Sequence, residues 1–328
     1  SKDKFGIVRK FEIKITPESS QKRSTIKAII PHIKHEIPIC ILFRALGIEN
    51  DQELFQAIAG PTDTFKYIVA NINEVKDNEE YNVDSMAEAD LIFIAVGTPP
   101  LSSGQADLSA VFGVAEAVFN SYSQQALSDF KVLITKSTVP VGTGDKIIAI
   151  REKCGVAESK VAVMSNPEFL REGTAIYDFF HPDRIVLGSD SKAALDIVSK
   201  LYDPLYRRDT PIVTTNLKTA ELSKYASNAF LATKITFINE IANLCEKTEI
   251  NIDDIAIGMG LDQRIGSRFL RAGPAYGGSC FPKDTKAITS TADKFQTNLS
   301  VIKSVIKSNE NRSKLLLKRV YKILNNKV

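Results

Sequence analysis

The sequence is poor in the residues that hold metals and disulfides. Its 328 residues include no tryptophan, three histidines and four cysteines, the last at positions 40, 154, 245 and 280. The cysteines are widely spaced and form no C-x-x-C pair, which argues against a disulfide framework and against a zinc site. His32 and His35 have no cysteine or acidic cluster beside them. We therefore expect no metal site, and we expect any catalysis to use groups other than histidine.

Long apolar runs are also missing. The sequence has no stretch of about 18 apolar residues, so no membrane-spanning helix is expected. The first residues, SKDKFGIVRKFEIKI, lack the apolar core of a signal peptide. These absences predict a soluble, cytoplasmic protein.

Charge is distributed unevenly along the chain. The net charge is +3, but residues 301–328 contain eight Lys and Arg against one Glu. Apolar residues recur at helical spacing in the same segment. The solvated face of an amphipathic helix is therefore favoured over a polyanion-binding site.

From about residue 90 the sequence alternates short apolar runs with helical patterns. The apolar runs are residues 91–96 (LIFIAV), 132–135 (VLIT), 161–164 (VAVM), 184–188 (RIVLG) and 211–215 (PIVTT). Strands that are apolar throughout and alternate with helices are typical of a doubly wound parallel sheet. The expected fold is α/β: an incomplete, Rossmann-like parallel sheet, then a long central helix and a helical dimerisation region, with an unrelated α+β segment at the N-terminus.

Three of these runs end in loops rich in Ser, Thr, Asn, Gly and Pro, namely GTPP, STVPVGTG and SNPEFLREGTA. In open parallel sheets, ligands bind outside the carboxyl ends of the strands. A single loop of this composition is typical of an ordinary turn. Three such loops in succession favour a ligand-binding site at this edge of the sheet.

A long helix without internal Gly or Pro is predicted over residues 219–248. Lys224 and Asn228 are four residues apart, so they share one face of this helix. On residue type alone, both side chains are expected in solvent.

The stretch GGSCFPKD, residues 277–284, surrounds Cys280 with residues that could activate it. A thiol attacks as thiolate, which a nearby lysine or exposed backbone N–H groups favour. Gly277 and Gly278 permit unusual backbone conformations, while Lys283 and Asp284 offer a cation and a carboxylate. These residues alone do not decide whether Cys280 is an inert buried cysteine or a nucleophile.

Together these motifs resemble the UDP-glucose/GDP-mannose dehydrogenase family over about residues 85–328. In order, the residues that carry the resemblance are FIAVGTPP, GQADLSAV, KSTVPVGTG, SNPEFLREGTAIYDFFHPDRIVLG, ELSKYASNAFLATKITFINEIANLCE, GLDQRIGSRFLRAGPAYGGSCFPKD and KSVIKSNENR. FLREGTA, HPDRIVLG and the GLDQRIG segment are most similar to UDP-glucose 6-dehydrogenases, whereas GDP-mannose enzymes share much of the cysteine motif.

The resemblance implies oxidation of UDP-glucose to UDP-glucuronate with two NAD+, through a thiohemiacetal and a thioester on a cysteine. GDP-mannose or another UDP-sugar is the alternative substrate. The implied catalytic residues are Cys280, Lys224, Asn228, Asp284, Glu168 and Thr138. In the family pattern the lysine and the asparagine amide stabilise oxyanions. The aspartate positions or activates a water molecule together with the lysine, and the threonine holds that water. The glutamate takes part in hydrolysis of the thioester.

Binding residues follow from the same resemblance. The cofactor-binding set is Val96, Thr98, Thr138, Glu172 and Lys283. The substrate-binding set is Phe169, Leu170, Lys224, Asn228, Arg264, Phe269, Arg271, Tyr276 and Gly277. Arg264 is expected to reach the sugar from a neighbouring subunit, and the 219–248 helix to form the core of a homodimer. For Phe269 and Tyr276, plain core packing stays an alternative. No membrane partner and no specific nucleic acid is expected.

Two parts of the family pattern are not found in the sequence. No strand followed by G-x-G-x-x-G opens the sheet, since VGTGDKI and GMGLDQR have only two of the glycines. A C-terminal UDP-binding domain is expected to be absent. Residues 5–60 instead resemble a segment of the second-largest subunit of DNA-dependent RNA polymerase.

The expected domains are therefore an atypical, polymerase-subunit-like segment (1–84), a partial NAD-binding domain (85–215) and a helical central domain with the cysteine motif (216–328). The alternative to an active enzyme is an inactive chimera or fragment that carries a polymerase-derived interaction segment.

Overall fold

The computed structural model describes residues 10–12, 27–29, 67–70, 89–125, 129–171, 173–206 and 210–324. They form two compact units. The first contains the described residues up to Thr98 together with Leu108–Glu221, and the second contains Pro99–Asp107 and the described residues from Leu222 onward.

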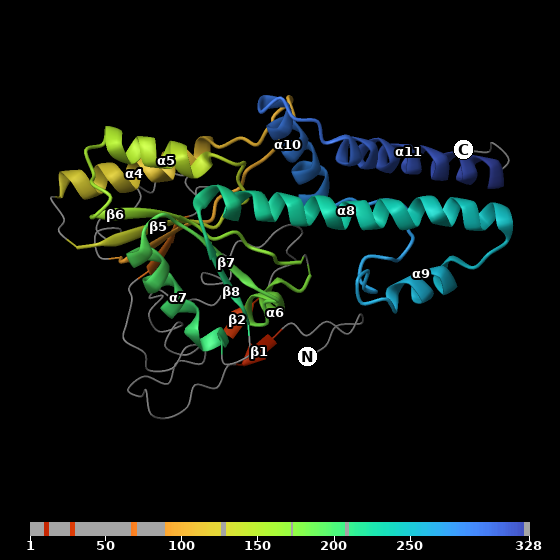
Figure 1. Cartoon of the computed structure of the whole chain (residues 1–328), viewed down its shortest axis with the longest axis horizontal. Coiled ribbons are helices and arrows are strands. Elements are labelled where there is room, and N and C mark those ends of the chain that lie inside the picture. The colour runs from red at the N-terminus through yellow and green to blue at the C-terminus, as the bar shows by residue number, and fades with distance from the viewer. Residues whose placement is uncertain are drawn as a thin grey trace. The chain divides into compact units, whose positions relative to one another are not determined.

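A six-stranded sheet in the order β3-β4-β5-β6-β7-β8 is the framework of the first unit (Figure 1). The strands are β3 (Tyr67–Ala70), β4 (Leu91–Ile94), β5 (Lys131–Thr135), β6 (Val161–Ser165), β7 (Ile185–Gly188) and β8 (Ile212–Thr215). All neighbouring strands pair in parallel except β6 and β7, which pair antiparallel through Ser165 and Gly188. The five predicted strands are present, but the direction reverses at β7, so the sheet is mixed.

Strand β3 extends the sheet beyond the strands that the sequence predicted. Tyr67 to Ala70 pair in parallel with Leu91 to Ile94. Strand β3 is thus the edge strand of the sheet, next to β4. The 20 residues between β3 and β4, 71–90, contain no glycine.

Helices cover both faces of the sheet. Helices α4 (Ser109–Gln124) and α5 (Thr143–Lys153) lie on one face and α7 (Lys192–Tyr206) on the other (Figure 1), while the short α6 (Ala175–Phe180) lies between β6 and β7 in sequence. Ile92 and Ile94 pack with α4 and α5, whereas Leu91 and Phe93 pack with α7. Successive residues of a strand point to opposite faces, so a sheet covered on both sides needs strands that are apolar throughout.

Four helices make up most of the second unit. They are α8 (Leu217–Thr248), which begins in the first unit, α9 (Ile252–Gly260), α10 (Cys280–Lys294) and α11 (Ser300–Ile323). Helix α8 starts two residues earlier than predicted because Asn216 Oδ1 accepts a hydrogen bond of 2.8 Å from the Thr219 N–H, which makes Asn216 its N-cap.

Among the described residues nearer the N-terminus, β1 (Lys10–Glu12) and β2 (Lys27–Ile29) form a separate antiparallel pair. Within the described ranges, no helix has the length and apolar character needed to span a membrane.

Candidate functional site

The predicted site residues divide between the two units. Those in the second unit centre on a hydrogen bond between α8 and α10. Asn228 Nδ2 donates to Asp284 Oδ2 over 2.6 Å, and both side chains are buried. Asn228 lies one helical turn after Lys224 on α8, and Asp284 lies one helical turn after Cys280 on α10. Lys224 and Cys280 are also predicted catalytic residues. Lys224 is also buried, at 3% exposure. The expectation that these polar side chains lie in solvent is therefore wrong, because the packing of α8 encloses them.

Apolar contacts fix the direction of α10 against α8. Tyr225 and Ala229 of α8 cluster with Ala287 and Ile288, near the middle of α10. Ala232, farther along α8, instead belongs to a cluster that includes Tyr276 and packs against Phe281 at the start of α10. These contacts hold α10 where it crosses α8 at a steep angle (Figure 1).

Cys280 is the first residue of α10. The preceding Gly278 has φ = 76°, in the left-handed region that favours glycine, and this turn brings the chain into the helix. Pro282 falls within the first turn, where proline is tolerated. The half-buried Cys280 thiol therefore sits where backbone N–H groups and the positive end of the helix dipole stabilise a negatively charged sulfur. Ser279 Oγ lies 3.7 Å from its Sγ.

Lys283 was predicted to bind cofactor. Its Nζ lies 3.7 Å from Asp284 Oδ1, and its side chain is 13% exposed. The Asp284 carboxylate thus faces an amide donor from α8 and a cation from its own helix.

Two predicted substrate-binding aromatics pack against Phe281, the residue after the cysteine. The Phe269 and Tyr276 rings each make an edge-to-face contact with it, with ring centroids 6.2 Å apart. Burial raises the pKa of Tyr276, and hydrogen bonds with Asn309 hold its backbone on both sides. Tyr276 is thus part of the packed core of this unit. Phe269 differs, because φ = 65° is rare for an aromatic residue and marks stored backbone strain.

The other predicted residues of this unit are exposed. Arg271 and Gly277 lie on the surface, and no atom lies within 4 Å of the point that a Cβ on Gly277 would occupy. The Arg264 side chain is 89% exposed and pairs with Asp262 at 2.6 Å, a contact that raises the pKa of Arg264.

In the first unit, the loops after β4 and β5 are tied to each other. Ser137 Oγ accepts the Val96 N–H at 2.8 Å and donates to Val96 O at 2.7 Å. Thr98 Oγ1 donates to Thr138 O at 2.9 Å. Three predicted residues, Val96, Thr98 and Thr138, thus lie together at the carboxyl ends of neighbouring strands, and Ser137, which the sequence analysis did not single out, connects them.

The loop after β6 carries the remaining predicted residues of the first unit. Glu168 Oε2 accepts the Leu170 N–H at 2.5 Å, so the carboxylate closes a turn in its own loop. The Arg184 guanidinium stacks on the Phe169 ring, 3.6 Å from its centroid. Glu172 lies outside the described residues.

Glu221 is a buried carboxylate that the sequence analysis missed. Its two oxygens each accept a 2.7 Å hydrogen bond, from the Gly142 and Gly144 N–H groups at the start of α5. These groups have no partner inside the helix, so Glu221 caps α5 from a distance. Burial raises the pKa of Glu221 to about 7, against the lowering effect of the two hydrogen bonds. Glu221 shares a helix face with Lys224 and Asn228, and this spacing was a usable signal.

Comparisons with known proteins identify related families. Residues 65–206 match the NAD binding domain of the UDP-glucose/GDP-mannose dehydrogenase family, and residues 218–311 match its central domain. Residues 4–97 match domain 2 of the RNA polymerase subunit Rpb2, which overlaps the first of these matches and extends beyond the predicted 5–60.

Named relatives agree with these family matches. A UDP-glucose 6-dehydrogenase of Rhizobium meliloti (strain 1021) is 50% identical over 239 residues, which cover 72% of this chain and 53% of the relative. Among solved structures, a UDP-glucose dehydrogenase from Pyrobaculum islandicum aligns with a TM-score of 0.70 and 38% identity, over 75% of this chain and 56% of that one. A GDP-mannose dehydrogenase from Pseudomonas aeruginosa aligns with a TM-score of 0.53 and 30% identity, over 74% and 55%. The chain spans about half the length of the curated relatives it matches.

Proposed function

The chain belongs to the UDP-glucose/GDP-mannose dehydrogenase family over residues 65–311, and we propose that it oxidises UDP-glucose to UDP-glucuronate with two NAD+. The observation that carries the proposal is the buried Asn228–Asp284 hydrogen bond, with Cys280 one turn before Asp284 on the same helix. A buried amide and carboxylate beside a thiol at a helix N-terminus form a site for acyl chemistry on sulfur.

Cys280 is the proposed nucleophile. Hydride loss from the primary alcohol of the sugar yields an aldehyde, and the sulfur adds to it to form a thiohemiacetal. Loss of a second hydride converts this adduct to a thioester. Water then attacks the carbonyl carbon, the carbon–sulfur bond breaks, and the thiol returns with a free carboxylate as product. Covalent capture holds the aldehyde in the site between the two oxidations.

Lys224 and Asn228 are the proposed stabilisers of negative charge on the reacting oxygen. An amide NH2 has two hydrogens, and Asn228 uses one on Asp284, which leaves the other for a substrate oxygen. Asp284 is held by Asn228 and Lys283, so its carboxylate is oriented before substrate binds. We assign it, with Lys224, the task of positioning or activating water. From the resemblance, Thr138 is assigned to hold that water and Glu168 to assist hydrolysis of the thioester.

NAD+ is the proposed acceptor of both hydrides. The loops after β4 and β5 are the proposed cofactor edge, because Val96, Thr98 and Thr138 lie together at the carboxyl ends of adjacent strands, where hydrogen bonds between the loops hold them in place. The connection from β3 to β4 does not fit the cofactor in the usual way, because residues 71–90 have no glycine to let a pyrophosphate approach the backbone. Glu172 and Lys283 complete the proposed cofactor set.

UDP-glucose is the preferred substrate among the nucleotide sugars. In structural alignment, identity is 38% to the Pyrobaculum islandicum UDP-glucose dehydrogenase and 30% to the Pseudomonas aeruginosa GDP-mannose dehydrogenase. The proposed contacts beyond the reacting carbon are Phe169, Leu170, Phe269, Arg271, Tyr276 and Gly277. GDP-mannose or another UDP-sugar is the alternative, and a cytoplasmic location remains a prediction.

A homodimer through α8 is part of the proposal. Phe230, Phe237 and Leu244 are spaced seven residues apart on this helix and are 65%, 45% and 60% exposed. Apolar residues at that spacing form the seam between paired helices. The exposed Arg264 is proposed to reach the sugar bound by the partner subunit.

An inactive chimera is the second candidate, and the match of residues 4–97 to an RNA polymerase domain favours it. Under this alternative the chain binds neither substrate productively and does not turn over. The two candidates are separated by incubating the purified full chain with UDP-glucose and NAD+. Formation of NADH and UDP-glucuronate supports the enzyme, and the absence of both at high protein concentration contradicts it.

A further inference from the structure

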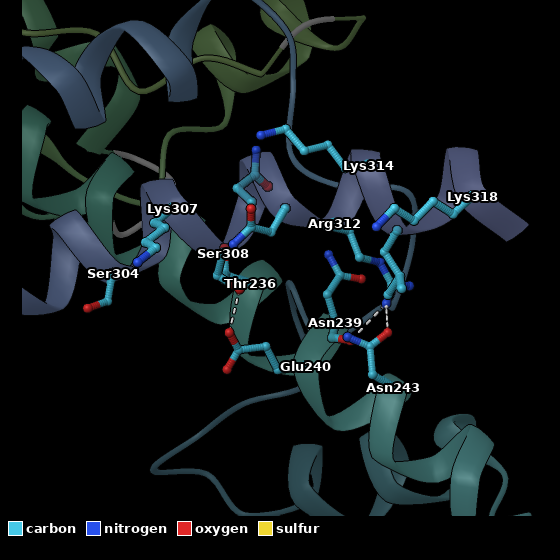
Figure 2. Close-up of a pocket in the computed structure, with 13 residues that line it drawn as sticks. Thr236, Asn239, Glu240, Asn243, Ser304, Lys307, Ser308, Arg312, Lys314 and Lys318 are labelled. Atoms are coloured by element: carbon cyan, nitrogen blue, oxygen red, sulfur yellow. Dashed lines mark hydrogen bonds between the residues drawn. The ribbon is translucent and has the colours of Figure 1, made fainter.

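A polar cleft of about 620 Å³ lies between α8 and α11 (Figure 2), and none of the residues proposed for catalysis lines it. Helix α8 lines it with Thr236, Asn239, Glu240 and Asn243, and α11 contributes its cations, Lys307, Arg312, Lys314 and Lys318. Both helices belong to the second unit. The volume is in the range of sites that enclose small organic ligands.

Two buried polar atoms in the cleft lining have no hydrogen-bond partner in the structure. They are Asn239 Nδ2 and Thr236 Oγ1, in side chains of residues that are 3% and 4% exposed. Asn239 Oδ1 accepts the Gly273 N–H at 2.8 Å, which fixes the orientation of the amide and leaves its NH2 group as the unmatched donor. A buried donor without an acceptor is costly, so an oxygen acceptor is the missing partner.

The charge of the cleft lining also favours a ligand with negatively charged oxygen atoms. Four cations stand against one acidic residue, Glu240, which accepts a hydrogen bond from Ser308. The Arg312 guanidinium donates to three neutral oxygens, on Gly273, Asn239 and Asn243. Burial and the neighbouring Arg319 lower the pKa of Arg312, against the raising effect of Glu246. An anion in the cleft relieves this imbalance.

We propose that this cleft binds the phosphate group of a small molecule. Phosphate supplies several acceptor oxygens and the negative charge that the lining lacks, and lysine and arginine are its usual ligands. Asn239 holds the anion at the base of the cleft through its NH2 group, while Lys307, Lys314 and Lys318 neutralise it at the rim. The solvated basic face of α11 thus has a binding role.

The cleft is separate from both other sites proposed on α8. Asn239 lies eleven residues beyond Asn228, or about 16 Å along the helix axis. At roughly 100° per residue, the cleft-lining side chains of α8 point about 110° away from the stripe formed by Phe230, Phe237 and Leu244. Anion binding can therefore be measured without reference to turnover or to dimerisation.

The test is to titrate the full chain with inorganic pyrophosphate and to measure the heat of binding by calorimetry. Sodium chloride holds the ionic strength constant. We expect saturable binding of one pyrophosphate per chain. Joint replacement Lys307→Ala and Lys314→Ala weakens it by roughly tenfold, because two charge contacts are lost. The matched control is Lys303→Ala with Lys322→Ala, which removes two lysines of α11 outside the cleft and leaves the affinity unchanged.

A second variant tests the Asn239 donor at unchanged net charge. Asn239→Ser removes the NH2 group and keeps a hydroxyl oxygen on the side chain, so we expect it to lose pyrophosphate binding while its melting temperature shows that it is folded. The variant Asn239→Asp, which also adds a negative charge, should bind no pyrophosphate either. The proposal is overturned if millimolar pyrophosphate does not bind. It is also overturned if the control pair weakens binding as much as the cleft pair, or if Asn239→Ser or Asn239→Asp binds like the unmodified chain.

Discussion

Asn228 on α8 and Asp284 on α10 are joined by a 2.6 Å hydrogen bond, although 56 residues separate them in the sequence. The bond connects the two helices that carry the proposed oxyanion-stabilising residues and the proposed nucleophile. Because Asp284 is 1% exposed, its carboxylate depends on protein donors for the stabilisation that water would otherwise provide.

Changing this pair tests whether it has a chemical role or only a structural one. We expect Asp284→Asn to cost about 1–3 kcal/mol in unfolding free energy, because the amide oxygen still accepts from Asn228 but an NH2 group replaces the oxygen that faces the Lys283 cation. We expect the oxidation rate to fall by at least about 100-fold, as when a positioned polar group is removed from an active site.

The exchange of both residues, Asn228→Asp with Asp284→Asn, is the control. It restores an amide-to-carboxylate bond with the direction reversed, so thermal stability recovers while the rate stays low. Recovery of the rate together with stability shows that the pair serves only to hold the two helices.

The pH dependence of stability tests the environment of Glu221. Burial raises its pKa from 4.5 to about 7. The folded chain therefore binds the proton more tightly than the unfolded chain, and the stabilisation present below pH 4.5 is lost as the pH rises to about 7. A shift of this size corresponds to a loss on the order of 3 kcal/mol.

The glutamine side chain in Glu221→Gln does not ionise, so this variant does not lose the stability that the unmodified chain loses. The melting temperature of the variant minus that of the unmodified chain should therefore increase from pH 5 to pH 8. Glu152→Gln, at an exposed position on α5, is the matched control and should follow the unmodified chain at every pH. Parallel pH profiles for Glu221→Gln and the unmodified chain contradict the assignment of a raised pKa.

The apolar stripe on α8 predicts the oligomeric state. Phe230→Ser with Phe237→Ser removes two of its three exposed apolar side chains, so light scattering after gel filtration should move from twice the chain mass to the single-chain mass of 36.1 kDa. Val213→Ser, at a 49% exposed position in β8, should leave the mass unchanged. A single-chain mass for the unmodified protein rules out the dimer.

Much of the fold could be predicted because its strands are short and apolar throughout. LIFIAV and VLIT are buried on both faces of the sheet, and this burial is what the sequence pattern reports. The reversal at β7 could not be predicted, because the apolar pattern of RIVLG is the same in either direction. Strand β3 was missed because it lies in the N-terminal segment that the sequence analysis assigned to an unrelated fold, and its pairing with β4 places it in the sheet.

The site was predicted less evenly. Spacing placed Lys224 and Asn228 on one helix face, but only tertiary packing shows that they are buried and that Asn228 meets Asp284. Glu221 lies on the same face, so its spacing signalled a place beside them, but its partners, the backbone N–H groups of Gly142 and Gly144, follow only from the tertiary structure. Ser137 was missed for a similar reason, since its hydroxyl bonds to backbone atoms of β4 and the loop that follows.

The most direct test of the proposed chemistry measures both products of the unmodified chain and of Cys280→Ser with UDP-glucose and NAD+. The unmodified chain should form two NADH for each UDP-glucuronate. Cys280→Ser should form no UDP-glucuronate, because a hydroxyl replaces the thiol that captures the aldehyde. Cys154→Ser, at another half-buried cysteine, should match the unmodified chain. Sustained UDP-glucuronate formation by Cys280→Ser would contradict the account.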